Sequence, residues 1–162
     1  MANDSMEEAI QYAKKYLEDL LSFFGLNTEV YATAEDDGIE LSVPSTHMNG
    51  FLIGQRGDTM RALQFMTSMS LKSKEYTYTR VNVDIADYKK HRQERVAEQA
   101  EEWIKQAKES NEPFSLRPMN AADRRIVHKV AAEYGLATHS EGEGRDRHIV
   151  IEPATKEVTE ED

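Results

Sequence analysis

The stretch from Gly50 to Met66, GFLIGQRGDTMRALQFM, places two glycines inside sequence that otherwise has the apolar pattern of a helix. Glycine in a helix interior costs roughly 1 kcal/mol relative to alanine. Gly54 and Gly57 therefore predict two helices joined by a tight turn, where another backbone can approach closely because no Cβ is in the way. The start of the second helix would direct free N–H groups at an anion, and Arg56 adds charge. On its own, however, a G-x-x-G is more often a simple helix–turn–helix connection.

The periodicity around this turn predicts a helix, two strands, two helices and a strand, in that order. Apolar residues recur at helical spacing up to Gly25, two β-rich runs flank the turn-forming EDDG, and a third run alternates. The predicted elements are a helix over 6–24, strands over 28–34 and 38–43, the helices on either side of G-x-x-G, and a strand over 78–88.

The rest of the chain predicts a long helix over 88–110 and a second small module. NEPFSLRPMN carries two prolines and is the best candidate for a domain boundary. Asn120 is placed to cap a helix that ends at Gly135, and strands are predicted over 136–139 and 148–152. We expect domains at 1–87 and 113–153, a connecting helix at 88–112 that can also pack with the second domain, and a disordered acidic tail at 154–162.

The formal net charge of −10 argues at first against a nucleic-acid partner. Its distribution changes that conclusion. Residues 1–40 hold ten acidic and two basic side chains, and residues 152–162 hold five and one, which leaves the stretch 41–151 at +2. The basic residues there are clustered, as in YKKHRQER, DRR and RDRH. Any one such cluster is usually a solvated face.

The residues around the glycine break resemble a known nucleic-acid-binding signature. LIGQRGDTMRAL is similar to the signature of the KH domain, and the element order resembles its type II arrangement. In that family the loop clamps the backbone of about four single-stranded nucleotides while bases lie in an adjacent groove. The resemblance implies that Gly54, Gln55, Arg56 and Gly57 form the RNA-binding loop. Ile53, Met60 and Leu63 fall at apolar signature positions and are expected in the core, and Asp58 places a carboxylate beside the loop.

A second motif lies in DRRIVHKVAAEY. At 100° per residue, four basic side chains occupy one arc of the helix and the apolar side chains the opposite arc, so the basic arc is expected to face outward. The basic arc is Arg124, Arg125, His128 and Lys129; the apolar arc is Ile126, Val127, Val130, Ala131 and Tyr134. An R-x-x-x-H spacing arises easily by chance, but the strings PMNAADRRIVHKVA and SEGEGRDRHIVIEP are similar to the R-3-H domain.

The two motifs in this order resemble the Jag family of bacterial proteins, which join a KH domain to an R-3-H domain. The resemblance covers roughly residues 6–153. It implies an α+β fold with a type II KH domain, a long helix and a small α/β R-3-H domain. It also implies binding of single-stranded RNA, with single-stranded DNA as an alternative, through Arg124 and His128 supported by Arg125, Lys129, Arg145 and Arg147.

The family is associated with control of cell elongation and division, and its members can pair with a small protein made of one KH domain. Pairing of two copies of this chain is the alternative. Many Jag proteins carry a further N-terminal domain, whereas this chain starts at the KH helix; we expect either a short natural member or a fragment.

Other functional classes find little support in the sequence. The chain has no cysteine, which removes disulfides, thiolate metal sites and cysteine nucleophiles. It also shows no membrane-length apolar run, signal peptide or nucleotide-binding fingerprint, so we expect a cytoplasmic, non-enzymatic protein without a cofactor or membrane partner. A metal site could be drawn in THSEGEGRDRH, but its ligand spacing matches no known site. The candidate ligands are His139, Glu141, Glu143, Asp146 and His148.

The sequence therefore predicts an RNA-binding regulator of two modules. The alternative is a protein-interaction or dimerisation scaffold in which a KH fold has little RNA affinity. The acidic first helix, the single basic residue of the loop and Asp58 favour that alternative. Salt separates the two, because binding through several phosphates weakens steeply as salt rises.

Overall fold

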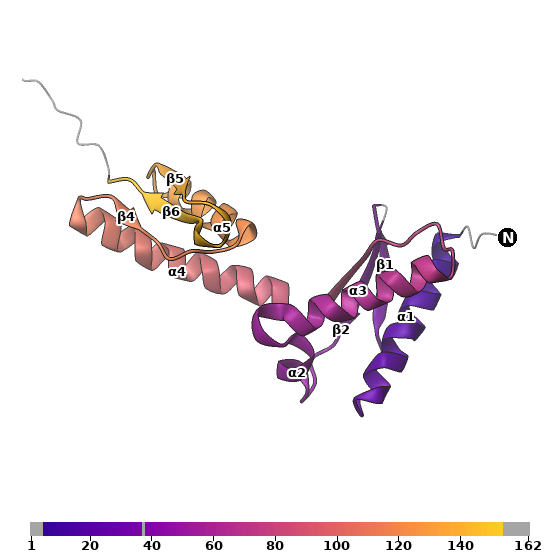
Figure 1. The fold of residues 1–162 in the computed structure, drawn as a ribbon. Helices are drawn as coiled ribbons and strands as arrows, with labels where there is room; N and C mark the ends of the chain where they lie inside the picture. The colour runs from indigo at the N-terminus through magenta and orange to yellow at the C-terminus, as the bar shows by residue number, and fades with distance from the viewer. Residues whose placement is uncertain (1–4, 37, 154–162) are drawn as a thin grey trace, which may run out of the picture. The chain divides into compact units, whose positions relative to one another are not determined.

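The computed structural model describes residues 5–36 and 38–153 and divides the chain into two compact units between Lys89 and Lys90. The predicted acidic tail, 154–162, lies outside the described residues. Helices and small sheets are both present, so the predicted α+β class is confirmed (Figure 1). No helix of the described ranges is long and apolar enough to cross a membrane.

The first unit is a three-stranded sheet packed against helices. Its elements are α1 (Met6–Phe23), β1 (Tyr31–Glu35), β2 (Gly38–Val43), α2 (Asn49–Ile53), α3 (Asp58–Ser73) and β3 (Val81–Ile85), in the predicted order. The sheet order is β1-β2-β3, with β1 antiparallel and β3 parallel to β2. The alternating burial of β3 follows from its period of two, with Val81, Val83 and Ile85 in the core.

Helices α1 and α3 supply the other side of this core. They contribute Ala9, Ala13, Leu17 and Leu21 from α1, and Met60, Leu63 and Leu71 from α3. The phenol of Tyr12 and the hydroxyl of Ser70 lie 2.6 Å apart and join the two helices. The expectation that Met60 and Leu63 are core residues is confirmed, and Ile53 packs against the same core.

Two predicted strands are shorter in the structure, each for a local reason. The strand predicted from Thr28 begins at Tyr31, because the Val30 N–H donates instead to the Glu18 carboxylate of α1 (2.9 Å). The strand predicted over 78–88 ends at Ile85, because Ala86 and Asp87 both adopt a left-handed backbone with φ of 53°. The long helix α4 (Tyr88–Ser110) then begins, with the predicted bounds.

The second unit packs most of α4 and a further helix with a three-stranded sheet. Its elements after α4 are β4 (Phe114–Ser115), α5 (Ala121–Glu133), β5 (Thr138–Glu141), a single 3₁₀ turn η2 (Gly144–Asp146) and β6 (His148–Ile151). The sheet is antiparallel in the order β4-β6-β5. The two units divide within the first turn of α4, between Lys89 and Lys90, rather than at NEPFSLRPMN, because Ala100, Ile104 and Ala107 of α4 are buried in the second core.

Candidate nucleic-acid interface

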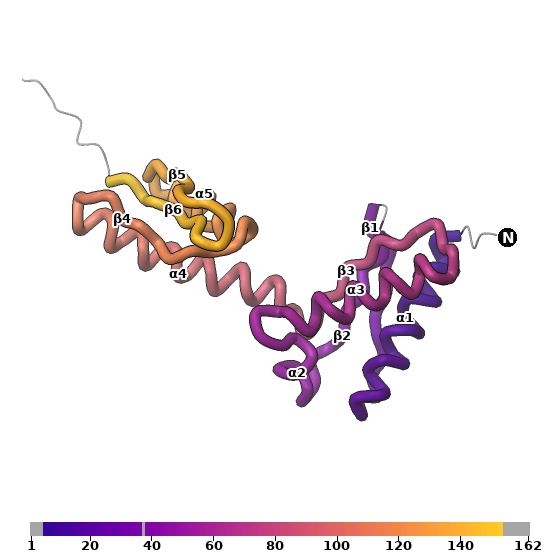
Figure 2. The backbone as a smooth tube through the Cα atoms, in the orientation of Figure 1, coloured from indigo at the N-terminus to yellow at the C-terminus, as the bar shows by residue number. Residues whose placement is uncertain are grey.

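The backbone turns sharply between α2 and α3, at the two glycines that interrupt the apolar sequence (Figure 2). Gln55, Arg56 and Gly57 form a single 3₁₀ turn, η1. Gly54 has φ 70° and ψ −174°, and Gly57 has φ 80°, conformations that glycine adopts readily. The Gly54 N–H donates to the Gly50 carbonyl (3.0 Å), which ends α2. The predicted pair of helices joined by a tight turn is therefore present.

Gly54 is also required by close packing against the start of α3. A Cβ at this position would lie 2.2 Å from the Thr59 Oγ1 atom and 2.9 Å from the Thr59 backbone nitrogen. At Gly57, a Cβ would lie 3.1 Å from a ring carbon of Tyr88. Because Gly54 has no side chain, the first turn of α3 packs closely against it.

The charged residues of the turn are arranged so that the carboxylate is neutralised. Arg56 is exposed and has a left-handed backbone, with φ 55° and ψ 26°. Asp58, the acidic residue beside the loop, forms an ion pair with Arg61 one turn along α3. The paired Asp58 carboxylate therefore repels an anion at the turn less strongly than an unpaired carboxylate would.

A hollow of about 380 Å³ lies between α3 and the edge strand β3. Its walls carry three cationic side chains and one aromatic ring. The lining residues are Arg61, Gln64, Phe65, Ser68 and Lys72 from α3, with Thr79, Arg80 and Val81 from the other side. Phe65 is 65% exposed, so its ring is free to stack on a planar ligand. A polar, cationic hollow of this kind suits a nucleotide.

A second hollow shares Gln64, Arg80 and Val81 with the first and is also lined by the acidic residues Glu35, Asp36 and Glu40. The sequence analysis missed Arg61, Gln64 and Arg80 as site residues. Arg61, Gln64, Phe65 and Ser68 are three or four residues apart along α3 and therefore lie near one face of this helix. Arg80 faces them only in the tertiary structure.

On α5, the structure divides the predicted basic arc into two parts. Arg125 and Lys129 are exposed, as expected, but Arg124 and His128 are half-buried and hydrogen-bonded within the unit. The prediction that all four face outward is therefore wrong for these two. The helical wheel placed the apolar face correctly for Val127, Val130 and Ala131, which are buried, but it carries no information about which neighbouring strand covers the flank of the helix.

His128 contacts β5 through both ring nitrogens. Its Nδ1 atom lies 2.6 Å from the Thr138 hydroxyl oxygen and its Nε2 atom 3.3 Å from the Ser140 hydroxyl oxygen. Burial lowers the pKa of His128 below its usual 6.5, and the nearby charges of Arg124 and His139 act in the same direction. The imidazole is therefore mainly neutral at pH 7.

Arg145 and Arg147 are exposed in the loop between β5 and β6. Gly142 closes this loop, because its φ is 79° and a Cβ there would lie 2.9 Å from the Asp146 carbonyl oxygen. The loop and the outer side of α5 thus provide four exposed cations, Arg125, Lys129, Arg145 and Arg147.

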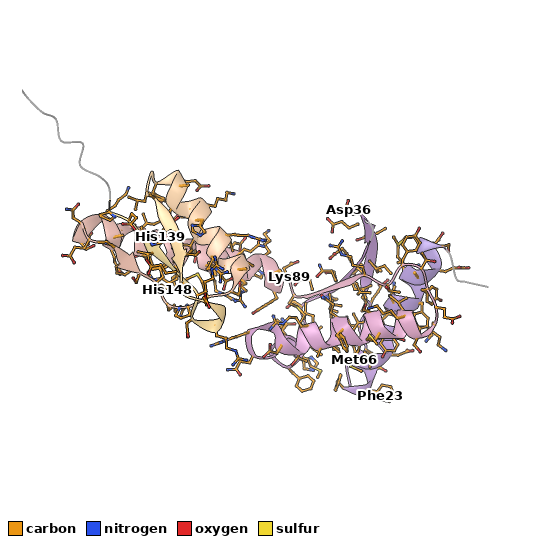
Figure 3. All side chains as sticks on the ribbon, turned by 45° about the horizontal axis from the view of Figure 1, so that its top comes forward. Phe23, Asp36, Met66, Lys89, His139 and His148 are labelled. Carbon is orange, nitrogen blue, oxygen red and sulfur yellow. The ribbon has the colours of Figure 1, made fainter. Side chains whose placement is uncertain are left out.

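Three of the candidate metal ligands of this region, His139, Glu141 and His148, have other partners. The His139 Nε2 atom lies 2.8 Å from a Glu141 carboxylate oxygen and its Nδ1 atom 3.1 Å from a Glu152 carboxylate oxygen, and the His148 Nδ1 atom contacts the Asp146 carbonyl oxygen (2.9 Å). Both histidines are labelled in Figure 3. Within residues 5–36 and 38–153, no group of three or more histidine, aspartate or glutamate side chains is arranged to hold a metal ion.

Comparison with known proteins identifies the class of the second unit. The R-3-H domain matches residues 94–153, a range that includes most of α4 and all of α5, β5 and β6. The helix–sheet arrangement around Arg124 and His128 is therefore that of an R-3-H domain.

Similarity to particular proteins extends over nine tenths of the chain. The RNA-binding protein KhpB of Bacillus subtilis (strain 168) is 29% identical over 147 residues, which are 89% of this chain and 70% of the relative. KhpB of Clostridium symbiosum is 27% identical over 90% of this chain and 64% of its own length. KhpB of Streptococcus pneumoniae serotype 2 (strain D39) is 25% identical over 90% of this chain and 43% of its own length. Together with the R-3-H match, these relatives support the membership of this chain in the Jag/KhpB family, so the predicted resemblance is confirmed.

Proposed function

We propose that the chain binds single-stranded RNA without catalysing a reaction, with the first unit acting as a type II KH domain. The supporting topology is the order α-β-β-α-α-β, with β3 parallel to β2 and a G-x-x-G turn between α2 and α3. The proposed loop residues are Gly54, Gln55, Arg56 and Gly57. The R-3-H unit would bind a neighbouring stretch of the strand.

The observation that carries this proposal is the hollow between α3 and β3. Arg61 links it to the turn, since the Arg61 Nη1 atom would lie 3.3 Å from a Cβ at Gly57 and the Arg61 side chain also lines the hollow. A strand whose phosphates meet the turn could therefore place a base beside Phe65, with Lys72 and Arg80 available for the following phosphates. Stacking on an exposed ring and cationic contacts are the two features of single-strand binding that tolerate any sequence.

The relatives support RNA as the ligand because they are named RNA-binding proteins. The chain spans between 43% and 70% of the length of those relatives, so their complete activity is not carried over. A cytoplasmic regulator linked to cell elongation and division is part of the proposal, and it depends on the family resemblance alone.

The test is a fluorescence-anisotropy titration of labelled single-stranded RNA at low and high salt, with single-stranded DNA of the same sequence in parallel. Arg56→Gly removes the charge of the turn while keeping its left-handed backbone, and Arg80→Gln removes a charge from the hollow. Lys15→Gln is the matched control, because Lys15 is an exposed cation of α1 paired with Asp19. We expect both site variants to lose affinity and to reduce the salt slope, and the control to bind as the unaltered chain does. Absence of RNA binding by the unaltered chain would exclude the proposal.

A second candidate function, a protein-interaction or dimerisation scaffold, is favoured by exposed apolar side chains on the helices of the first unit. Phe23 is 86% exposed, and Phe51 is 56% exposed. Phe65, Met66 and Met69 of α3 are also exposed, as is Phe24, which directly follows α1; Phe23 and Met66 are labelled in Figure 3. A second copy or a small single-KH protein would cover such a surface. Sedimentation analysis of the unaltered chain and of Met66→Lys separates this function from RNA binding, because an apolar interface responds little to salt.

A further inference from the structure

Arg124 and His128, the two residues after which the R-3-H domain is named, hold other parts of the second unit in place. The Arg124 Nη1 atom donates to the Met119 carbonyl oxygen (2.6 Å), just before α5 begins. The Met119 N–H in turn donates to the Arg147 carbonyl oxygen (3.2 Å). The Met119 peptide segment therefore connects the Arg124 side chain to the backbone of one of the exposed loop arginines.

His128 fixes the other end of the same loop. Its two ring nitrogens contact the hydroxyl groups of Thr138 and Ser140, which both lie on β5. Ser140 pairs with Ile149 of β6, and Glu141 pairs with His148, so the β5–β6 ladder continues to the residues that flank the loop. The loop 142–147 is thereby tied to α5 on both sides, through Met119 at its end and through β5 at its start.

The geometry leaves His128 poorly suited to contact a phosphate itself. Both ring nitrogens already have hydroxyl partners, and turning the ring toward solvent would break both contacts with β5. A neutral imidazole also adds no net charge to a phosphate site. The exposed cations Arg125 and Lys129 follow Arg124 and His128 by one residue each and remain on the solvent side of α5.

We propose that Arg124 and His128 are positioning residues, which hold Arg145 and Arg147 where these two, with Arg125 and Lys129, contact RNA phosphates. This inference rests on the proposed RNA-binding function. It assigns direct contact to the four exposed cations and an indirect role to the pair that gives the domain its name.

A double-mutant cycle on the full chain tests the assignment, with labelled random-sequence single-stranded RNA as the probe. The cycle combines His128→Ala with the pair Arg145→Ala and Arg147→Ala, and a second cycle replaces His128→Ala by Arg124→Met. We expect each change alone to lower the affinity for RNA about tenfold, which is within the range of coupling measured between residues of one network. In the background that lacks both loop arginines, His128→Ala and Arg124→Met should cause no further loss.

A second set of variants removes the partners of His128 and leaves His128 in place. Thr138→Val with Ser140→Ala deletes the two hydroxyl groups and keeps every charge, so we expect it to reproduce the loss caused by His128→Ala. His128→Asn, whose side-chain amide can still bond to Thr138, should restore part of the affinity. Circular dichroism and thermal unfolding check that each variant is folded, and the hydroxyl variants keep the test valid if His128→Ala does not fold.

Three results would overturn the inference while leaving RNA binding intact. They are additive losses in the cycles, full affinity in the hydroxyl variant, and unchanged affinity of a folded His128→Ala. The first two would make His128 a direct contact, and the third would leave it a purely structural residue. If the unaltered chain binds no RNA, the proposed function fails, and the role assigned to the four cations fails with it.

Discussion

At Gly54 the backbone adopts φ 70° and ψ −174°, a conformation that residues with a side chain almost never reach. Packing adds a second constraint at the same atom, because Thr59 occupies the space that a Cβ would need. Arg56, two residues later, tolerates its left-handed conformation at a smaller cost. The turn therefore requires glycine at position 54, whereas position 56 accepts a residue with a side chain. A substitution at Gly54 would therefore change both the stability of the first unit and any RNA binding by the turn.

Gly54→Ala is expected to destabilise the first unit by about 1–3 kcal/mol, through backbone strain and the contact with the Thr59 backbone nitrogen. Gly50→Ala provides the control, because a Cβ at Gly50 of α2 would have nothing within 4 Å and its φ is not positive. That substitution should leave stability unchanged or raise it by up to about 1 kcal/mol. Urea unfolding followed by circular dichroism measures both, and equal stability of the two variants would show that the turn is not strained.

His128 gives the second unit a defined dependence on pH. Its pKa is lower in the folded chain than the usual 6.5, because burial and the charges of Arg124 and His139 disfavour the protonated ring. The unfolded chain then binds the proton more readily, so the stabilisation is complete above pH 6.5 and is lost as pH falls through the lower folded pKa. Unfolding measured above and below that pH should show a smaller decrease on acidification for His128→Asn than for the unaltered chain. An equal decrease would assign the effect to other groups.

Among the helices and strands, those with strong local signals were predicted best. The ends of β2 and α4 lie where the pattern placed them, and Asn120 caps α5 by accepting from the Asp123 N–H (2.9 Å). Local sequence could not predict contacts between distant elements. Three features depend on tertiary packing: the hydrogen bond from the Val30 N–H to Glu18, the position of Arg80 across the hollow from α3, and the contact of β5 with His128.

An ion pair that no local pattern indicates joins α4 to α5. Arg92 donates to both carboxylate oxygens of Asp123, with Nη2–Oδ2 at 2.8 Å and Nε–Oδ1 at 3.2 Å. The side chain of Asp123 is only 13% exposed and that of Arg92 27%. Asp123 therefore lies in the first turn of α5 and also attaches this helix to α4, in addition to the apolar contacts of the second core.

Asp123→Ala should destabilise the second unit by about 2 kcal/mol, less than the roughly 3–5 kcal/mol typical of a fully buried pair, because Arg92 keeps partial access to solvent. Asp123→Asn retains hydrogen-bonding capacity and is expected to lose less. Arg95→Ala on the exposed side of α4 is the control and should have little effect. Thermal unfolding of the three variants compares them, and identical midpoints for Asp123→Ala and Arg95→Ala would show that the pair contributes nothing.

On the scale of the whole molecule, two separate cores carry two separate candidate sites. The buried residues of the first core come from segments before Lys89, and those of the second from Ala100 onward. Each unit can therefore be expected to fold from its own segment, with α4 needed by the second. Neither site is densely cationic: the turn carries Arg56, the hollow beside it adds Arg61, Lys72 and Arg80, and the second site has four exposed cations on α5 and the β5–β6 loop. Weak sites of this kind gain most from being joined in one chain.

We expect the unaltered chain to bind a long single-stranded RNA about 10²-fold more tightly than either residues 1–89 or residues 90–162 alone, because the second contact becomes intramolecular. The gain should disappear when the RNA is too short to reach both sites, which makes a series of RNA lengths the decisive comparison. Anisotropy titrations of the three proteins measure it, with circular dichroism to show that each unit is folded. An equimolar mixture of the separate units is the control and should bind no better than the stronger unit. Equal affinity of the chain and one unit at every RNA length would mean that a single site binds the RNA and that the other serves a different partner.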